Sequence, residues 1–235
     1  MVSIVIPAYN CSKYIKQCVQ SCNNQIYDSF EIIVIDDNSS DDLYQFTKNF
    51  NIRYIRNDKN IGPGASRNIG IKVAKGEYIS FLDCDDLMNP NKLELSVRAF
   101  EEDDKIGMVC GNYQILVDRV RLCHPFYQTP IDIDYDLMMK QNFVASGSTT
   151  VKKSVFDDIG LFNEEYWIAE DYDMWVRISE RYKIKYIHEV LYYYSIVSGD
   201  SSLTQRADIQ MNHIKNINKI KEESKKRVFG DKFKK

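Results

Sequence analysis

The stretch that decides the fold is Tyr78-Ile-Ser-Phe-Leu-Asp83-Cys-Asp85-Asp86, in which an apolar run leads directly into three carboxylates. An apolar run of this length between Gly76 and Asn89-Pro90 is typical of a buried strand. Three acids are too costly to bury without partners, so we expect them at the carboxyl end of that strand, facing a crevice. In open α/β sheets, this edge is where ligands bind.

Asp83 and Asp85 are two residues apart, which places their side chains on the same side of an extended segment. Two neighbouring carboxylates repel each other unless a positive charge lies beside them. A hard divalent cation that also binds substrate phosphates meets this need, so we expect Mn²⁺ or Mg²⁺ here. Aspartate is also common in turns and at helix N-caps, and this structural interpretation stays open, above all for Asp86.

Strand and helix patterns alternate along the rest of the chain. The patterns predict strands at residues 2–6 (ended by Pro7), 30–35, 52–55, 78–82, 107–116, 184–187 and 190–194, and helices at 13–24, 43–50, 91–102 and 154–159. A second acid cluster, Asp36-Asp37-Asn-Ser-Ser-Asp41, follows the second strand. Apolar strands that alternate with helices indicate an α/β fold with a mainly parallel, doubly wound sheet.

Residues 57–70, Asn-Asp-Lys-Asn60-Ile-Gly62-Pro-Gly64-Ala-Ser-Arg67-Asn-Ile-Gly70, form a glycine-containing loop ahead of a helix. Its glycines allow close backbone approach, and Arg67 offers a fork of donors for phosphate or carboxylate. The loop lacks the Gly-Lys-Ser/Thr ending of a Walker loop, and Arg67 stands where the dinucleotide fingerprint needs a third glycine. An ordinary loop and helix start remains an equal alternative.

Composition excludes several classes of protein. The chain has 235 residues, 44% of them hydrophobic, and a net charge of −3, so we expect no nucleic acid partner. No apolar run approaches the length of a membrane span, and the first residues do not have the pattern of a signal peptide. Six cysteines without zinc spacing, with Cys18 and Cys22 one helical turn apart, favour reduced core thiols and a cytoplasmic location.

The last thirty residues differ in charge from the rest. From Arg206 onward there are ten Lys and Arg against four Asp and Glu. We expect residues 206–235 to form a basic helical tail, either packed on the domain with a solvated basic face or in peripheral contact with an anionic membrane surface. Within residues 1–205, the weak periodicity of 120–136 marks the change from a nucleotide-binding half (1–112) to an acceptor-binding half (113–205).

Five pieces now stand in a recognisable order. They are Ser3-Ile-Val-Ile-Pro7-Ala-Tyr9-Asn10, Asp36-Asp37-Asn-Ser, Asn60-Ile-Gly62 through Arg67-Asn-Ile-Gly70, Phe81-Leu-Asp83-Cys-Asp85-Asp86 and Glu170-Asp171-Tyr-Asp173-Met-Trp175-Val-Arg177. Over residues 1–205 the chain resembles glycosyltransferase family 2, whose members have the GT-A fold and a DxD motif. The resemblance implies an inverting, metal-dependent transfer of a hexose from a nucleotide-diphosphate sugar in polysaccharide biosynthesis. A UDP-sugar is the expected donor.

The resemblance also implies roles for single residues. Those expected to contact the nucleotide-sugar donor are Pro7, Ala8, Tyr9, Asp37, Asn60, Arg67 and Asp83. Among them, Tyr9 and its neighbours line the base pocket, Asp37 hydrogen-bonds a uracil-like base, and Asp83 contacts the ribose or the metal. Asp85 binds the Mn²⁺ or Mg²⁺ that bridges the diphosphate.

Asp171 is expected to be the general base that takes the proton of a hydroxyl on a glycan or lipid-linked acceptor. A carboxylate opposite the leaving group suits such a reaction. An acid favoured by the dipole of a helix N-terminus is the structural alternative. We expect Glu170 and Asp173 to be structural, capping the helix or pairing with Arg177.

One departure from the family pattern affects the metal site. Members often carry Tyr-Arg-x-His after the last strands, whereas the corresponding run here is Tyr194-Ser-Ile-Val197. The third metal ligand is therefore a water or a phosphate oxygen in this scheme. A catalytically silent sugar-nucleotide or glycan-binding module remains an alternative, as does a nucleotidyltransferase, although the loop after the first strand lacks the Gly and Lys/Arg expected of one.

Overall fold

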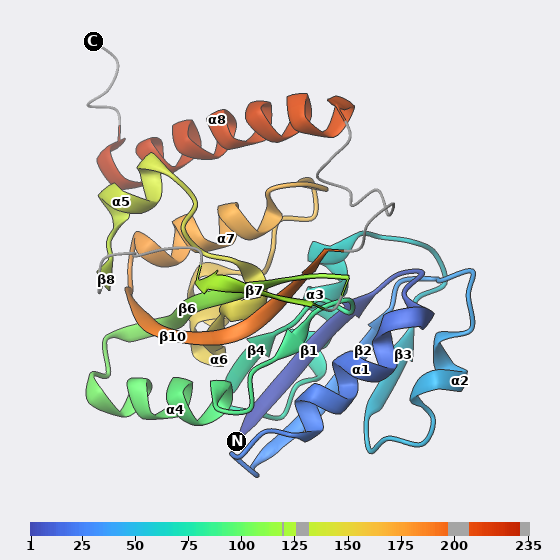
Figure 1. The fold of residues 1–235 in the computed structure, drawn as a ribbon. Helices are drawn as coiled ribbons and strands as arrows, with labels where there is room; N and C mark the ends of the chain where they lie inside the picture. Colours follow the sequence, from blue (N-terminus) through green and yellow to red (C-terminus); the bar gives the residue numbers. More distant parts are fainter. Residues whose placement is uncertain (119, 126–131, 197–206, 231–235) are drawn as a thin grey trace.

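A central mixed sheet lies between the helices (Figure 1). The computed structural model of the protein describes residues 1–118, 120–125, 132–196 and 207–230. The strands are β1 (Val2–Ala8), β2 (Phe30–Asp36), β3 (Arg53–Arg56), β4 (Tyr78–Phe81), β5 (Leu87–Met88), β6 (Ile106–Val117), β7 (Val120–Pro125), β8 (Asp132–Ile133), β9 (Thr150–Lys152) and β10 (Lys183–Ile196). The helices are α1 (Ser12–Asn23), α2 (Leu43–Thr47), α3 (Pro63–Val73), α4 (Lys92–Glu102), α5 (Tyr135–Lys140), α6 (Lys153–Ile159), α7 (Glu170–Ser179) and α8 (Ala207–Phe229), with a 3-10 turn, η1 (Ser146–Ser148).

The strand order is β3-β2-β1-β4-β9-β6-β10-β5. β3, β2, β1 and β4 pair in parallel, and so do β6 and β10. Between these two parallel blocks lies β9, which is antiparallel to both β4 and β6. The predicted α/β class with mainly parallel pairing is confirmed, and the short strand β9 joins the two parallel blocks into one sheet.

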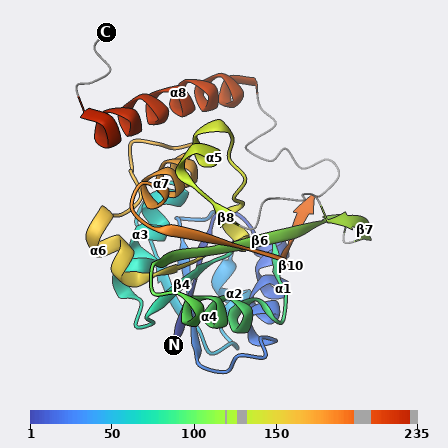
Figure 2. The same ribbon diagram turned by 90° about the vertical axis from the view of Figure 1, so that its left-hand side faces the viewer.

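Alternating side chains place one apolar cluster on each face of the sheet. Along β1, Ile4 and Ile6 pack with the buried face of α1, whereas Val5 packs on the opposite side with Ile71 of α3. This alternation is the period-2 pattern of a strand buried on both faces. Helices α1, α2 and α4 therefore cover one face, and α3, α6 and α7 cover the other, as the two views of the ribbon indicate (Figures 1 and 2).

Two local predictions were wrong, and one helix was not predicted. β1 continues through Pro7 to Ala8, because β4 pairs with β1 only as far as Val5, so the missing N–H of Pro7 leaves no gap in that ladder. The two short strands predicted near the C-terminal end are one strand, β10, with register shifts between Ile187 and Tyr192. Helix α5 begins where the stretch of weak periodicity ends, and the sequence had given no prediction for it.

Helix α8 lies along the outside of α7 (Figures 1 and 2). Ile220 and Ser224 are fully buried, and the Ser224 hydroxyl donates to Glu180 Oε1 over 2.6 Å. Arg227 pairs with the same carboxylate at 2.7 Å. The predicted basic segment is thus a helix packed on the domain, while Arg206 and residues 231–235 lie outside the described residues. In the part of the chain that the structure describes, no helix combines the length and apolarity needed to cross a membrane.

Four cysteines gather beside the Asp83 loop. Cys11, Cys18 and Cys22 are buried together on the α1 side of the sheet, and Cys84 packs against them. The Cys18 thiol donates to the carbonyl of Asp83 over 3.5 Å, and burial raises the pKa of Cys18 well above its ordinary value. Cys11, Cys18, Cys22, Cys84 and Cys110 are free thiols, and all of these except Cys84 are buried.

Candidate active site

The carboxyl ends of β1, β2 and β4 meet at one edge of the sheet. Ala8 pairs with Asp36, and the amide of Asp37 donates to the Ala8 carbonyl over 2.8 Å. On the other side of β1, the amide of Leu82, next to Asp83, donates to the Val5 carbonyl over 3.3 Å. Parallel pairing therefore brings together the two acid clusters that the sequence placed at strand ends.

Asp37 binds the loop that leads into α3. Its carboxylate accepts hydrogen bonds from the amides of Ile61 (2.9 Å) and Gly62 (2.8 Å) and from Asn57 Nδ2 (2.8 Å). Gly62 has a φ of 88°, a left-handed conformation that glycine adopts without strain. Asp37 is buried, so its observed partners are protein groups, and its contact with a base stays a prediction.

Sequence reasoning assigned no role to Asp36, which is fully buried beside Asp37. Its carboxylate accepts hydrogen bonds from Tyr54 and the amide of Ser39 and pairs with Arg56 at 2.6 Å. Burial works against the charged form, but these donors and the Arg56 charge still hold the pKa of Asp36 below its ordinary value. Asp36 therefore fixes the shape of the loop that follows β2.

Arg67 joins the two halves of the site. Its guanidinium is 4% exposed and binds Asp83 Oδ1 through Nη2 at 2.8 Å and Glu170 Oε1 through Nη1 at 2.7 Å. Burial alone would lower the pKa of Arg67, but the charges of Asp83, Glu170 and Asp171 raise it above its ordinary value. Its Nε is buried and has no hydrogen-bond partner among the described residues.

The structure corrects one of two expected ion pairs. Asp173 pairs with Arg177 at 2.9 Å, as expected, whereas Glu170 pairs with Arg67 and not with Arg177. Burial is the main cause that raises the pKa of Glu170 to about 7, against the opposing charge of Arg67. The spacing of four residues fits Asp173 and Arg177, whereas Glu170 lies seven residues from Arg177 and takes Arg67 of α3 as its partner instead.

Asp171 lies in the first turn of α7, half-buried at the edge of the site. Its Oδ2 accepts a hydrogen bond from the Ser146 hydroxyl over 3.0 Å, and Ser146 belongs to η1. Ala169 precedes the helix with a left-handed φ of 68°. The Ser146 hydroxyl therefore orients the carboxylate of the candidate base.

A buried lysine that sequence reasoning missed lies beneath the acids. Lys92 is fully buried, and its ammonium donates to the carbonyls of Phe81 (2.8 Å) and Gly147 (2.7 Å). Phe81 ends β4 just before the acid cluster, and Gly147 follows Ser146. Lys92 therefore links the end of β4, which leads to Asp83, to η1, whose Ser146 binds Asp171. Burial lowers the pKa of Lys92 to about 7.

The three acids after β4 differ in their surroundings. Asp83 is 40% exposed, Asp85 is exposed, and Asp86 is buried with its Oδ1 accepting from the amide of Ser195 over 2.8 Å. Asp86 is thus structural, in line with the structural interpretation that the sequence left open for it. Among the described residues, no three His, Cys, Asp or Glu side chains are arranged to hold a metal ion. The exposed pair is two hard oxygen donors, a set that suits Mg²⁺ or Mn²⁺ when a substrate supplies phosphate oxygens.

The remaining predicted donor contacts lie around the same edge. Pro7 and Ala8 end β1, and Tyr9, 52% exposed, follows them. Asn60 lies in the loop that Asp37 binds, and its Oδ1 is buried without a hydrogen-bond partner in the described part of the chain. These four residues and Asp37, Arg67 and Asp83 share one edge of the sheet, while their roles toward a donor stay predictions.

The family model of Glycosyl transferase family 2 matches residues 3–160. This chain belongs to glycosyltransferase family 2. It is 32% identical over 223 residues to the Escherichia coli UDP-Glc:alpha-D-GlcNAc-diphosphoundecaprenol beta-1,3-glucosyltransferase WfaP, and the match covers 92% of this chain and 86% of that relative. It is 31% identical over 224 residues to the Escherichia coli chondroitin synthase, covering 93% of this chain but 32% of the synthase. This family 2 chain therefore spans about a third of the synthase.

The fold is similar to that of solved structures. The crystal structure of S. aureus TarS 1–349 in complex with UDP-GlcNAc aligns with a TM-score of 0.71 at 20% identity, covering 98% of this chain and 73% of that chain. This likeness confirms the predicted GT-A fold. The match extends over nearly the whole chain, including most of the region beyond residue 160 that the family model does not cover.

Proposed function

We propose that this family 2 protein is an inverting glycosyltransferase that moves a sugar from a UDP-sugar to a hydroxyl of a lipid-linked saccharide or growing glycan. The observation that carries the proposal is Arg67, which places the donor-side acid Asp83 and the base-side residue Glu170 on one guanidinium. Asp171 follows Glu170 directly, so a donor-side acid and a candidate base lie around a single cation. The UDP-glucose donor and diphosphoundecaprenol-linked acceptor in the name of WfaP support the choice of donor and acceptor class.

The reaction needs one proton acceptor and one leaving group. In the proposed step the acceptor hydroxyl oxygen forms a bond to the anomeric carbon, the bond from that carbon to the β-phosphate oxygen breaks, and Asp171 takes the hydroxyl proton. Ser146 keeps the Asp171 carboxylate oriented through its hydrogen bond. A single displacement without a covalent intermediate inverts the anomeric centre.

Negative charge grows on the departing diphosphate. Asp83 and Asp85 are the residues proposed to hold Mn²⁺ or Mg²⁺, which would neutralise that charge when bound. Arg67 keeps Asp83 in place through its 2.8 Å ion pair and brings a permanent positive charge to this edge.

The test is release of UDP from a panel of UDP-sugars, with Mn²⁺, with Mg²⁺ and with EDTA. We expect turnover with at least one UDP-sugar and a lipid-linked acceptor, loss of turnover in EDTA, and metal-dependent UDP binding in calorimetry that Asp85→Ala weakens. Binding of a UDP-sugar without turnover would favour the silent binding module. Release of diphosphate from a nucleoside triphosphate and a sugar phosphate would instead favour a nucleotidyltransferase.

We also propose that α8 makes peripheral contact with an anionic membrane surface, at the inner face of the cytoplasmic membrane. Its exposed residues include Lys225 and Lys226 and, near its start, Met211 and Ile214, 76% and 61% exposed. Co-sedimentation with phosphatidylglycerol vesicles and with phosphatidylcholine vesicles tests this. Binding to the anionic vesicles alone is expected, and equal or absent binding contradicts the proposal.

A further inference from the structure

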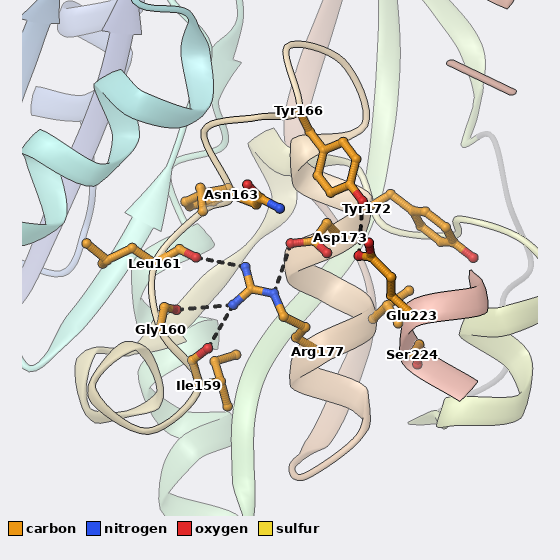
Figure 3. Close-up of polar contacts among 12 residues, drawn as sticks. Ile159, Gly160, Leu161, Asn163, Tyr166, Tyr172, Asp173, Arg177, Glu223 and Ser224 are labelled. Atoms are coloured by element: carbon orange, nitrogen blue, oxygen red, sulfur yellow. Dashed lines mark hydrogen bonds and ion pairs between the residues drawn. The ribbon is translucent and has the colours of Figure 1, made fainter. Parts of the chain in front are cut away.

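The loop between α6 and α7 is held along its length by side chains of other elements. In its first half, Asn68 donates to the Phe162 carbonyl over 2.9 Å and accepts from the Phe162 amide over 2.9 Å. Arg177 donates to the carbonyls of Ile159 (2.9 Å) and Leu161 (2.8 Å), as Figure 3 shows. These contacts fix the backbone where the chain leaves α6.

Helix α8 holds the second half of the same loop. The Tyr166 hydroxyl donates to Glu223 Oε2 over 3.2 Å (Figure 3), and the Lys219 ammonium lies 5.2 Å from the centre of the Tyr166 ring. Asn216 Nδ2 donates to the Ile168 carbonyl over 3.0 Å. The residues on both sides of Trp167 are therefore bound by α8.

Trp167 is more exposed than Tyr166 and Ile168, its neighbours in the chain. It is 49% exposed, although it sits between two held residues. The indole lies against Gly62, since a Cβ at Gly62 would be 3.0 to 3.4 Å from three carbons of the ring system. A single exposed aromatic side chain is common on protein surfaces, so a functional role for Trp167 has to be argued from its position.

That place is the edge of the candidate site. Gly62 is one of the two amides bound by Asp37, on the donor side. Two residues along, a Cβ at Gly64 would lie 3.0 Å from Cγ of Glu170, the residue before the candidate base. The indole therefore borders a loop that Asp37 binds at one end and Glu170 contacts at the other.

We propose that Trp167 is a stacking surface for a pyranose ring of the donor or the acceptor, which makes it a specificity-determining residue of the proposed transfer. One face of a pyranose is rich in C–H groups, and the face of an indole carries negative potential that attracts them. The hydroxyls at the rim of the sugar remain free for polar partners. A rigid loop presents the indole in place, so little conformational entropy is lost when a sugar binds.

The experiment uses the fluorescence of the chain, which has two tryptophans. Trp175 is fully buried, so Trp167 is the one that a ligand can reach. The probes are UDP, UDP-glucose and UDP-GlcNAc for the donor side, and methyl glucoside and methyl N-acetylglucosaminide for the acceptor side. We expect a sugar-bearing probe to change the emission beyond the change caused by UDP, and we expect Trp167→Phe to abolish that extra change.

Kinetics give the second readout. Trp167→Ala should raise KM for the partner whose sugar stacks by a few-fold to about tenfold, the size of an aromatic stacking contribution, while Trp167→Phe keeps most of the affinity. A donor-side stack raises KM for the UDP-sugar and leaves UDP affinity unchanged. An acceptor-side stack raises KM for the acceptor alone.

Several results would overturn the stacking role. If Trp167→Ala weakens UDP and UDP-sugar equally, the ring contacts the nucleotide. If it lowers Tm and Trp167→Phe fails to restore KM, the ring serves to cover Gly62. The inference depends on the proposed function, and the two failures are distinguishable: an intact protein that turns over no nucleotide sugar contradicts the function, whereas an active protein unaffected by Trp167→Ala contradicts only the stacking role.

Discussion

The proposed donor side, at the ends of β1, β2 and β4, and the proposed base side, at the start of α7, are held in place by different kinds of interaction. On the donor side, Ala8 and Asp37 are set by backbone pairing at the ends of neighbouring parallel strands. On the base side, Asp171 depends on a hydroxyl from η1, and its neighbour Glu170 depends on Arg67 of α3. The sheet sets the backbone at the strand ends, while the backbone before α7 lies outside the sheet and its acids need side chains from distant segments, so single substitutions should harm the base side more.

The largest effect is expected where the chemistry itself depends on one carboxylate. Asp171→Asn keeps the size of the side chain and removes the proton acceptor, so transfer should fall by roughly 10²–10⁴-fold with donor affinity unchanged. Transfer rates and UDP-sugar calorimetry on the same samples provide the measurement.

Ser146→Ala is the matched control for Asp171→Asn. It removes one hydrogen bond to the carboxylate, and a loss of about 2–10-fold is expected. Asp173→Asn cannot serve as a control, because Asp173 is buried in an ion pair with Arg177. Near-normal transfer by Asp171→Asn would assign the proton to another acid, Glu170 first.

A smaller effect, on stability, is expected when the link between the two sides is cut. Arg67→Met leaves Glu170 buried without its cation, and breaking such a pair costs about 3–5 kcal/mol when the remaining group stays charged. Glu170, whose pKa is already raised to about 7, holds its proton in the folded variant and loses it in the unfolded chain. The stability of the variant should therefore fall as pH rises above the ordinary range of a glutamate.

Urea unfolding at pH 5.5 and pH 8 measures this loss. The expected result is a larger deficit of Arg67→Met relative to the unsubstituted protein at pH 8. The double variant Arg67→Met with Glu170→Gln has no charge to bury and should regain part of the lost stability at pH 8. An equal deficit at both pH values would mean that the ion pair with Glu170 is not what Arg67 contributes.

The smallest effect is expected at Lys92, which ties β4 to η1. Burial lowers the pKa of Lys92 to about 7, whereas the unfolded chain keeps its proton to a much higher pH. The unfolded state therefore binds more protons above pH 7, and this residue makes the free energy of unfolding rise with pH there. Lys92→Met removes that contribution, so its stability relative to the unsubstituted protein should fall by about 1–2 kcal/mol between pH 7 and pH 9.

Urea unfolding at both pH values again provides the measurement. Lys92→Arg is a useful comparison, because a guanidinium stays charged throughout this range and should not reproduce the pH dependence. A stability difference between Lys92→Met and the unsubstituted protein that is constant from pH 7 to pH 9 would contradict the assignment.

The contrast between the two sides also explains what could be predicted from the sequence. Apolar runs ending in acids placed Asp37 and Asp83 at strand ends, because strand burial and the cost of burying charge are local rules. The buried face of α1, with Ile15, Cys18 and Cys22, followed from helical spacing in the same way. The fold class and the donor edge were therefore accessible to local reasoning.

The partners on the base side were not accessible in this way. Arg67 and Glu170 are 103 residues apart, and the sequence suggested only a helix cap or Arg177 on the same helix for Glu170. From the sequence alone, Lys92 was one polar residue at the start of an amphipathic helix. Its burial is explained only by the approach of η1 to β4. Two residues of opposite charge that lie far apart in the sequence leave no periodic pattern from which their pairing could be predicted.

The Arg67–Glu170 pair has a consequence for how the protein is made. Chains emerge from synthesis at about 5–20 residues per second, so the 103 residues between the two partners take roughly 5–20 s to appear. During that interval β1, β2 and β4 are available to pair, and Arg67 can meet Asp83 but not Glu170. The ion pair that joins the two sides of the candidate site can therefore form only after Glu170 has been synthesised, and the proposed transfer needs α7 in place.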